Sequence, residues 1–122
     1  MIDEKNKNEE LKENEKDIND TVLQLKKPVL IDGEERTKIP YDFDNLTGRD
    51  VDQVFKSLTK RGYVLTGPYE VDPVVGAAMF AQAAGLDYTD LERFSAKDYA
   101  KAGTLGRNFF IIDLNGNQTE NI

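Results

Sequence analysis

The sequence contains no cysteine, no histidine and no tryptophan among its 122 residues. Without cysteine there is no disulfide framework and no thiolate metal site. Without histidine the chain lacks the commonest metal ligand and the side chain that most often acts as a general base near neutral pH. These absences exclude zinc catalysis and the Ser-His and Cys-His catalytic sets. Carboxylates remain as the only plentiful groups for metal or acid–base chemistry.

Long apolar runs are also missing. No stretch approaches the ~20 residues that a transmembrane helix needs. The first ten residues, MIDEKNKNEE, lack the basic start and apolar centre of a secretory signal. We therefore expect a protein that acts in the cytoplasm where it is made and has no membrane partner.

The balance of charge is acidic, with a formal net charge of −7. Binding to nucleic acid needs lysine and arginine gathered on one face, so we expect no nucleic-acid partner. The only cluster of cations on an expected helix is Lys56, Lys60 and Arg61. Cations near the C-terminal end of a helix are favoured by the helix dipole, and this trio is best interpreted as a solvated helix end.

Composition divides the chain into three parts. The first 20 residues carry eight acidic and four basic side chains but only four apolar ones, too few to offset the entropy of ordering them. We expect residues 1–20 to be a disordered acidic tail and residues 21–114 to form a single globular domain. Asn115-Gly116-Asn117 then begins a polar C-terminal tail, residues 115–122.

The N-terminal part of the domain has the pattern of a β-hairpin. Asp32-Gly33 separates two runs of strand character, residues 21–31 and 34–43. Pro28 and Pro40 cannot donate to a strand ladder, which indicates exposed edges. Because a lone hairpin is only marginally stable, it must lean on other elements.

Two helices follow, each with clear end signals. Thr47 and Asp50 resemble a capping box for a helix over 48–61, which Gly62 ends. Asp72-Pro73 begins a second helix that reaches about Ala84. This helix is apolar nearly all round, so it lies either at the centre of the core or in an interface.

Capping patterns also mark the remaining helices. Thr89-Asp-Leu-Glu92 predicts a short helix to about Phe94, and Ser95-Ala-Lys-Asp98 begins another with an acidic first turn. Gly103 and Gly106 in this last helix favour close approach of another backbone, with a hinge as the alternative. The expected fold is α+β and mostly helical, an N-terminal β-hairpin packed on three to four short helices.

The acidic loop from Asp42 to Asp52 superficially resembles a calcium-binding loop. The positions that would need an oxygen ligand, a glycine and a glutamate hold Leu46, Thr47 and Gln53 instead. We therefore expect an Asp-rich loop that leads into a capped helix. No metal site, cofactor or catalytic residue is predicted, and a carboxylate-dependent enzyme is the weakest of the functional hypotheses.

Two apolar stretches exceed what a small core obviously needs, Val74–Ala84 and Phe109–Ile112. The simplest interpretation is core packing. The functional alternative is an exposed patch or groove that receives an apolar helix from another protein. Under that hypothesis the candidate partner-binding residues are Met79, Phe80, Phe109 and Phe110.

The order of short motifs is similar to that of a known family. The motifs are Leu25-Lys-Lys-Pro28, Leu46-Thr-Gly-Arg-Asp50, Val71-Asp-Pro73, Leu91 with Phe94, Ser95-Ala-Lys-Asp98 and Asn108-Phe-Phe110. Over about residues 21–112 the chain resembles the tail assembly chaperones of contractile-tailed bacteriophages and related prophages. The acidic stretch 1–20 is longer than the family pattern and receives no role.

The resemblance implies a non-catalytic protein in the cytoplasm of the bacterial host. It would bind the tape measure protein and assist tail-tube assembly, with the tail-tube protein as a further partner, and would be absent from the mature virion. Self-association is left open. The alternative is a structural accessory subunit that stays in the phage particle.

Overall fold

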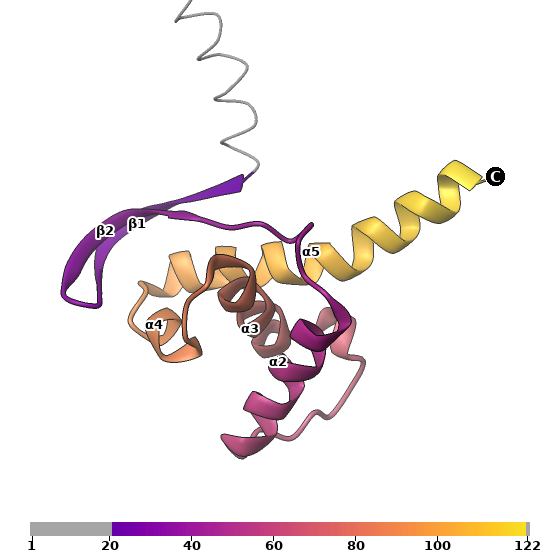
Figure 1. Ribbon diagram of the computed structural model, residues 1–122, viewed down its shortest axis with the longest axis horizontal. Helices are drawn as coiled ribbons and strands as arrows, with labels where there is room; N and C mark the ends of the chain where they lie inside the picture. Colours follow the sequence, from indigo (N-terminus) through magenta and orange to yellow (C-terminus); the bar gives the residue numbers. More distant parts are fainter. Residues whose placement is uncertain (1–20, 122) are drawn as a thin grey trace, which may run out of the picture.

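The computed structural model describes the backbone of residues 21–121 and the side chains of residues 21–111. An antiparallel hairpin precedes four α-helices and one short 3-10 helix, which confirms the predicted α+β class (Figure 1). The elements are β1 (Val22–Ile31), β2 (Glu34–Pro40), α2 (Gly48–Lys60), η1 (Tyr69–Val71), α3 (Pro73–Ala84), α4 (Tyr88–Glu92) and α5 (Ala96–Asn121). The acidic tail predicted for residues 1–20 lies outside the described residues.

The hairpin turns at Asp32 and Gly33, as predicted. Both residues have positive φ, 54° and 82°, which is the geometry of the tight turn that matches strand twist. β1 turns four apolar side chains toward the helices and β2 contributes Ile39, so one face of the ribbon is buried. The four on β1 are Leu23, Leu25, Val29 and Ile31.

A large irregular bulge interrupts the pairing of the two strands. Gln24 pairs with Lys38 and Val29 with Arg36, so residues 25–28 of β1 face a single residue of β2. Such a bulge leaves backbone N–H groups without a strand partner. Asp98 of α5 supplies the hydrogen-bond acceptor for two of these N–H groups instead. Its Oδ1 and Oδ2 accept from the Lys26 N–H at 3.0 and 2.9 Å, and Oδ2 also accepts from the Lys27 N–H at 3.2 Å.

Asp98 is fully buried although it is charged. Burial raises the pKa of this carboxyl, but the N–H groups of Lys26 and Lys27 and the Ser95 side chain lower it, and the net pKa lies below its usual value. The sequence predicted Asp98 as part of an acidic first turn. Its main contacts are instead with the hairpin, 71 and 72 residues away along the chain.

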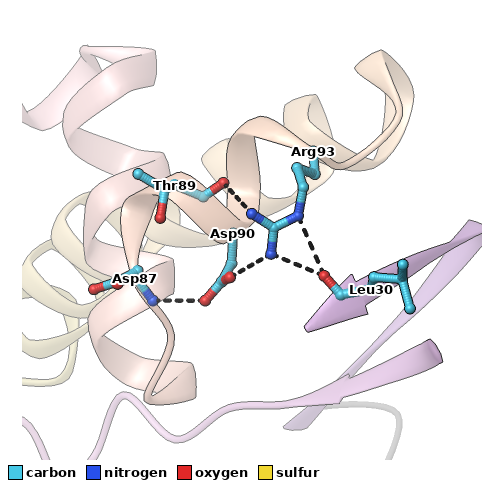
Figure 2. A network of polar contacts seen from close by, with 5 residues as sticks. All are labelled: Leu30, Asp87, Thr89, Asp90 and Arg93. Carbon is cyan, nitrogen blue, oxygen red and sulfur yellow. Dashed lines mark hydrogen bonds and ion pairs between the residues drawn. The ribbon is translucent and has the colours of Figure 1, made fainter. Parts of the chain in front are cut away.

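The C-terminal end of β1 is held by hydrogen bonds from an arginine side chain, as Figure 2 shows. Arg93 donates from Nη2 and Nε to the backbone carbonyl of Leu30 at 2.8 and 3.2 Å. The same guanidinium pairs with Asp90 at 2.6 Å. Two side chains, Asp98 of α5 and Arg93 directly after α4, therefore bind backbone groups of the hairpin.

Helix α3 lies at the centre of the core, as one of the two predictions for it stated. Ala77, Phe80 and Ala81 join the cluster beneath the hairpin. Val75, Ala78 and Met79 join a second cluster, with Val54 and Leu58 of α2 and Phe110 of α5. Because α3 has core on both sides, its sequence is apolar nearly all round rather than amphipathic.

Close contact between α3 and α5 depends on glycine. A Cβ atom added to Gly106 would lie 1.8 Å from the carbonyl oxygen of Gly76, and one added to Gly76 would lie 2.3 Å from that of Gly103. Such separations are far below any non-bonded contact between heavy atoms. The predicted close packing of Gly103 and Gly106 is thus confirmed, and α5 runs through this region without a break.

Three boundaries differ from the prediction. The second strand ends at Pro40 rather than at residue 43. Helix α4 begins after Asp87, whose capping box uses Asp90, and so starts before the expected Thr89. Helix α5 continues to Asn121, past the Asn115-Gly116 pair that was expected to end it. The cost of one glycine in a helix, ~1 kcal/mol, lowers helix stability but does not by itself stop the hydrogen-bond ladder.

Candidate partner-binding surface

The segment between α2 and α3, residues 62–72, carries an unusual amount of exposed apolar surface. We call it the connector. Its side chains of Val64, Leu65, Tyr69 and Val71 are 73%, 39%, 38% and 51% exposed. Among the residues whose side chains the structure describes, only one other large hydrophobic, Leu30, is this exposed. Loops are usually polar because they face water, so this concentration points to a surface that another molecule covers.

Both ends of the connector are fixed. Gly62 has a φ of 86° and ends α2, and the Tyr63 N–H donates to the Leu58 carbonyl at 2.9 Å. The Tyr63 hydroxyl donates to Oδ2 of Asp72 at 2.5 Å. Asp72 also accepts from the N–H groups of Val74 and Val75, so it caps α3 and closes the base of the connector with the same carboxylate.

The contact between Tyr63 and Asp72 is maintained near neutral pH. The hydrogen bond to Asp72 raises the pKa of the Tyr63 hydroxyl above its usual value, so the hydroxyl stays protonated and remains a donor. The loop is therefore held at its base while its apolar middle faces outward.

A chain of aromatic rings supports the connector from below. The ring of Tyr69 meets Phe55 of α2 edge-on at a centroid distance of 5.5 Å and Phe110 of α5 at 5.1 Å. Phe110 contacts Phe109 at 5.3 Å, and Phe109 stacks on Phe43 at 5.2 Å. These rings join the exposed connector to α5 near residue 110, beyond which the helix projects from the body of the fold (Figure 1).

The four residues predicted to bind a partner fall into two groups. Met79 and Phe80 are fully buried, in separate clusters on the two sides of α3. Core packing, the simpler interpretation, accounts for both, and neither lies on a surface of this fold. Phe110 is 8% exposed and Phe109 is partly buried. Phe110 contacts the ring of Tyr69 in the connector, and Phe109 contacts Phe110.

The connector residues themselves were not predicted as a site. Residues 63–71 read as a turn-containing link because Gly67-Pro68 interrupts them. A signal was nevertheless present: Val64, Leu65 and Val71 flank that turn in a segment that the sequence marks as a loop. Apolar residues in a loop must either fold back onto the core or remain exposed, and here they remain exposed.

Cations beside the connector are largely paired. Lys56 lies 3.1 Å from Asp52 and Arg61 lies 2.6 Å from Glu92. The guanidinium of Arg61 also covers the ring of Tyr88, 4.8 Å from its centroid. These contacts agree with a solvated helix end and are worth little stability because they are exposed.

The acidic loop between β2 and α2 is organised by its own backbone. Oδ1 of Asp42 accepts from the Asp44 N–H at 3.0 Å, and Asp50 completes the predicted capping box with Thr47. Within residues 21–111 no group of three or more aspartate or glutamate side chains is placed to hold a metal ion. In the same part of the chain no helix is both long and apolar enough to cross a bilayer.

Comparison with known proteins gives no assignment: no family model, no curated protein and no solved structure matches this chain.

Proposed function

We propose that this chain is a non-catalytic tail assembly chaperone of a bacteriophage or prophage, which binds the tape measure protein in the host cytoplasm and assists tail-tube assembly. The observation that carries this proposal is the exposed apolar surface of the connector, to which Val64, Leu65, Tyr69 and Val71 contribute. A chaperone for a long helical protein needs a surface that covers apolar side chains before assembly.

The connector suits that role physically. Its apolar side chains project from a loop whose base is fixed by Tyr63 and Asp72, so little order has to be gained when a partner binds. Aromatic rings, which dominate the energetics of protein interfaces, lie directly beneath it. Burial of one such side chain by a partner contributes about 1.5–3 kcal/mol.

The structure also gives a physical reason for part of the motif order. Leu25-Lys-Lys-Pro28 and Ser95-Ala-Lys-Asp98 lie far apart in the sequence, yet they meet where Asp98 binds the Lys26 and Lys27 N–H groups. One motif therefore supplies the N–H donors and the other supplies the carboxylate that accepts from them. This contact gives the two motifs a structural role in this fold and leaves partner binding to other residues.

The test is a pull-down of the full chain co-expressed with the longest helical protein encoded beside it. We expect a stable complex with the wild type and about tenfold or greater loss of co-purified partner for Val64→Asp combined with Leu65→Asp. Leu30→Asp is the matched control, because Leu30 is 57% exposed on the hairpin, away from the connector. This control should retain the partner.

Two results would overturn the proposal. One is the absence of any complex when the helical protein is equally well behaved alone. The other is detection of the chain by mass spectrometry in purified phage particles at a fixed stoichiometry, which would identify a structural accessory subunit. Equal loss of partner in the Leu30→Asp control would mean that the connector is not the specific binding surface.

A further inference from the structure

A groove runs between β1 and the first half of α5, on a different surface from the connector. It consists of two adjoining hollows of about 420 and 330 Å³ that share Lys101 and Thr104 of α5. The larger hollow has mainly apolar walls, and the smaller one has lysines around its rim. Their other main lining residues are Val22, Leu23, Tyr41 and Leu105 in the first, and Lys26, Lys97 and Asp98 in the second.

The charge at the smaller hollow is strongly unbalanced. Lys26, Lys97 and Lys101 are all exposed, and none of them forms an ion pair with another residue of the described part of the chain. The only carboxylate in the lining is Asp98, and both of its oxygens are occupied by the N–H groups of Lys26 and Lys27. Lys101 favours the charged form of Asp98 from a distance but does not bind it directly.

This arrangement is unexpected on an acidic protein. The chain as a whole carries −7, and lysines on such a surface usually lie among carboxylates. Here both oxygens of the nearby carboxylate, Asp98, are bound to backbone N–H groups, so the lysines at one end of the groove have no acidic partner among the described residues. An anionic ligand would supply the carboxylate partners that these lysines lack.

We propose that this groove binds an acidic peptide segment of a separate protein, with an apolar side chain in the hollow at Leu105 and carboxylates at Lys97, Lys101 and Lys26. The two ends are eight residues apart on α5, which corresponds to about 12 Å along a helix. An extended peptide covers that distance in about four residues. The ligand is therefore a short segment that carries an apolar anchor at one end and two or more acidic side chains at the other, in either chain direction.

A peptide fits the groove better than a nucleic acid does. The apolar hollow lined by Leu23 and Leu105 offers nothing to a phosphate backbone, and the net negative charge of the chain repels a long polyanion. The groove is separate from the connector, so this inference does not depend on the proposed chaperone function. Each surface can be altered without altering the other.

The experiment is selection of a random peptide library on the full chain at physiological salt. Three proteins are compared: the wild type, Lys97→Glu combined with Lys101→Glu, and the matched control Lys56→Glu combined with Lys60→Glu on α2. We expect peptides with an apolar residue within about four positions of two or more acidic ones to be enriched on the wild type and the control, and about tenfold less on the groove variant. An enriched peptide should shift the backbone amide resonances of Thr104 and Leu105 and leave those of Val64 and Leu65 unchanged.

Several results would overturn this proposal. The first three concern the selection: enrichment of basic or uncharged peptides, equal enrichment on the groove variant, or no enrichment on any protein. The fourth is a single-stranded oligonucleotide that binds more tightly than every selected peptide. A fourth protein separates one more case, with Glu9, Glu10, Glu13 and Glu15 of the full chain all changed to Gln. Acidic peptides enriched only on that protein would mean that residues 1–20 of the chain itself, rather than a separate protein, occupy the groove.

Discussion

The hairpin and the connector both rest on the α3–α5 pair, but they are held in opposite ways. Backbone groups of the hairpin are bound by two side chains from the helical part of the fold, Asp98 of α5 at the bulge and Arg93, directly after α4, at Leu30. Most of its apolar side chains face the core, with Leu30 as an exposed exception. The connector is fixed at its base by Tyr63 and Asp72 and is supported at Tyr69 by aromatic rings, while several of its apolar side chains face water.

This difference separates a structural region from a candidate binding region. A buried carboxylate on two backbone N–H groups fixes the position of the hairpin relative to α5, because moving it would leave a charge without partners. Among the described residues, no buried charge restrains the middle of the connector in this way. Exposed apolar side chains contribute little to the stability of the free chain, so their presence is better explained by a partner that covers them.

Removing the shared support of both regions should have the largest effect. In Gly106→Ala the added methyl group would meet the Gly76 carbonyl at 1.8 Å, and a backbone atom cannot move aside without separating α3 from α5. We expect the free energy of unfolding to fall by about 4 kcal/mol, measured by chemical denaturation. Helix propensity alone predicts the opposite sign, a gain of about 1 kcal/mol.

The control for this prediction is the same change in the connector. A Cβ atom added to Gly67 has no neighbour within 4 Å, so Gly67→Ala should change stability by less than about 0.5 kcal/mol. Equal stability of the Gly106 variant and the wild type would contradict the glycine-dependent contact between the helices.

Breaking the hairpin anchor should have the next largest effect. Asp98→Ala removes the acceptor of two backbone N–H groups and should cost about 3 kcal/mol in thermal or chemical unfolding. Asp52→Ala is the matched control, because Asp52 is exposed and pairs only with Lys56, and it should cost less than about 1 kcal/mol. Similar losses in the two variants would mean that the anchor does not hold the hairpin.

A pH titration sharpens the same contrast. The pKa of Asp98 is lowered in the folded chain, so its contribution is fully present above the unfolded pKa of about 3.9 and is lost as pH falls through the lower folded value. The difference in unfolding free energy between the wild type and Asp98→Asn should therefore be constant near neutral pH and shrink in acid. A difference that stays constant, or grows, below about pH 4 would refute this assignment.

The hairpin and the first helices could be predicted from sequence because their signals are local. Asp32-Gly33 sets its own turn, and Thr47 with Asp50 forms its own capping box. The role of Asp98 could not be predicted, because its partners are backbone groups exposed by a bulge some 70 residues earlier. Local pattern placed it only in the first turn of a helix.

The candidate site followed the same division. Apolar periodicity showed that α3 was unusually apolar, but not that core would lie on both sides of it, so Met79 and Phe80 could not be assigned to a surface or to the core. Exposure depends on which elements meet in space. Val64 and Val71 are exposed because none of the described elements covers the outside of the connector, a fact that only the assembled fold contains.

The smallest expected effect on stability concerns the connector itself. Val64 is 73% exposed, so Val64→Asp should change the free energy of unfolding by less than about 0.5 kcal/mol. Val54, on α2, is 3% exposed, and the same substitution there should prevent folding because it buries an unpaired charge. Thermal unfolding of the two variants measures this contrast directly. If Val64→Asp proves as damaging as Val54→Asp, the connector is part of the core in solution, and loss of a partner on substitution there would no longer indicate a binding surface.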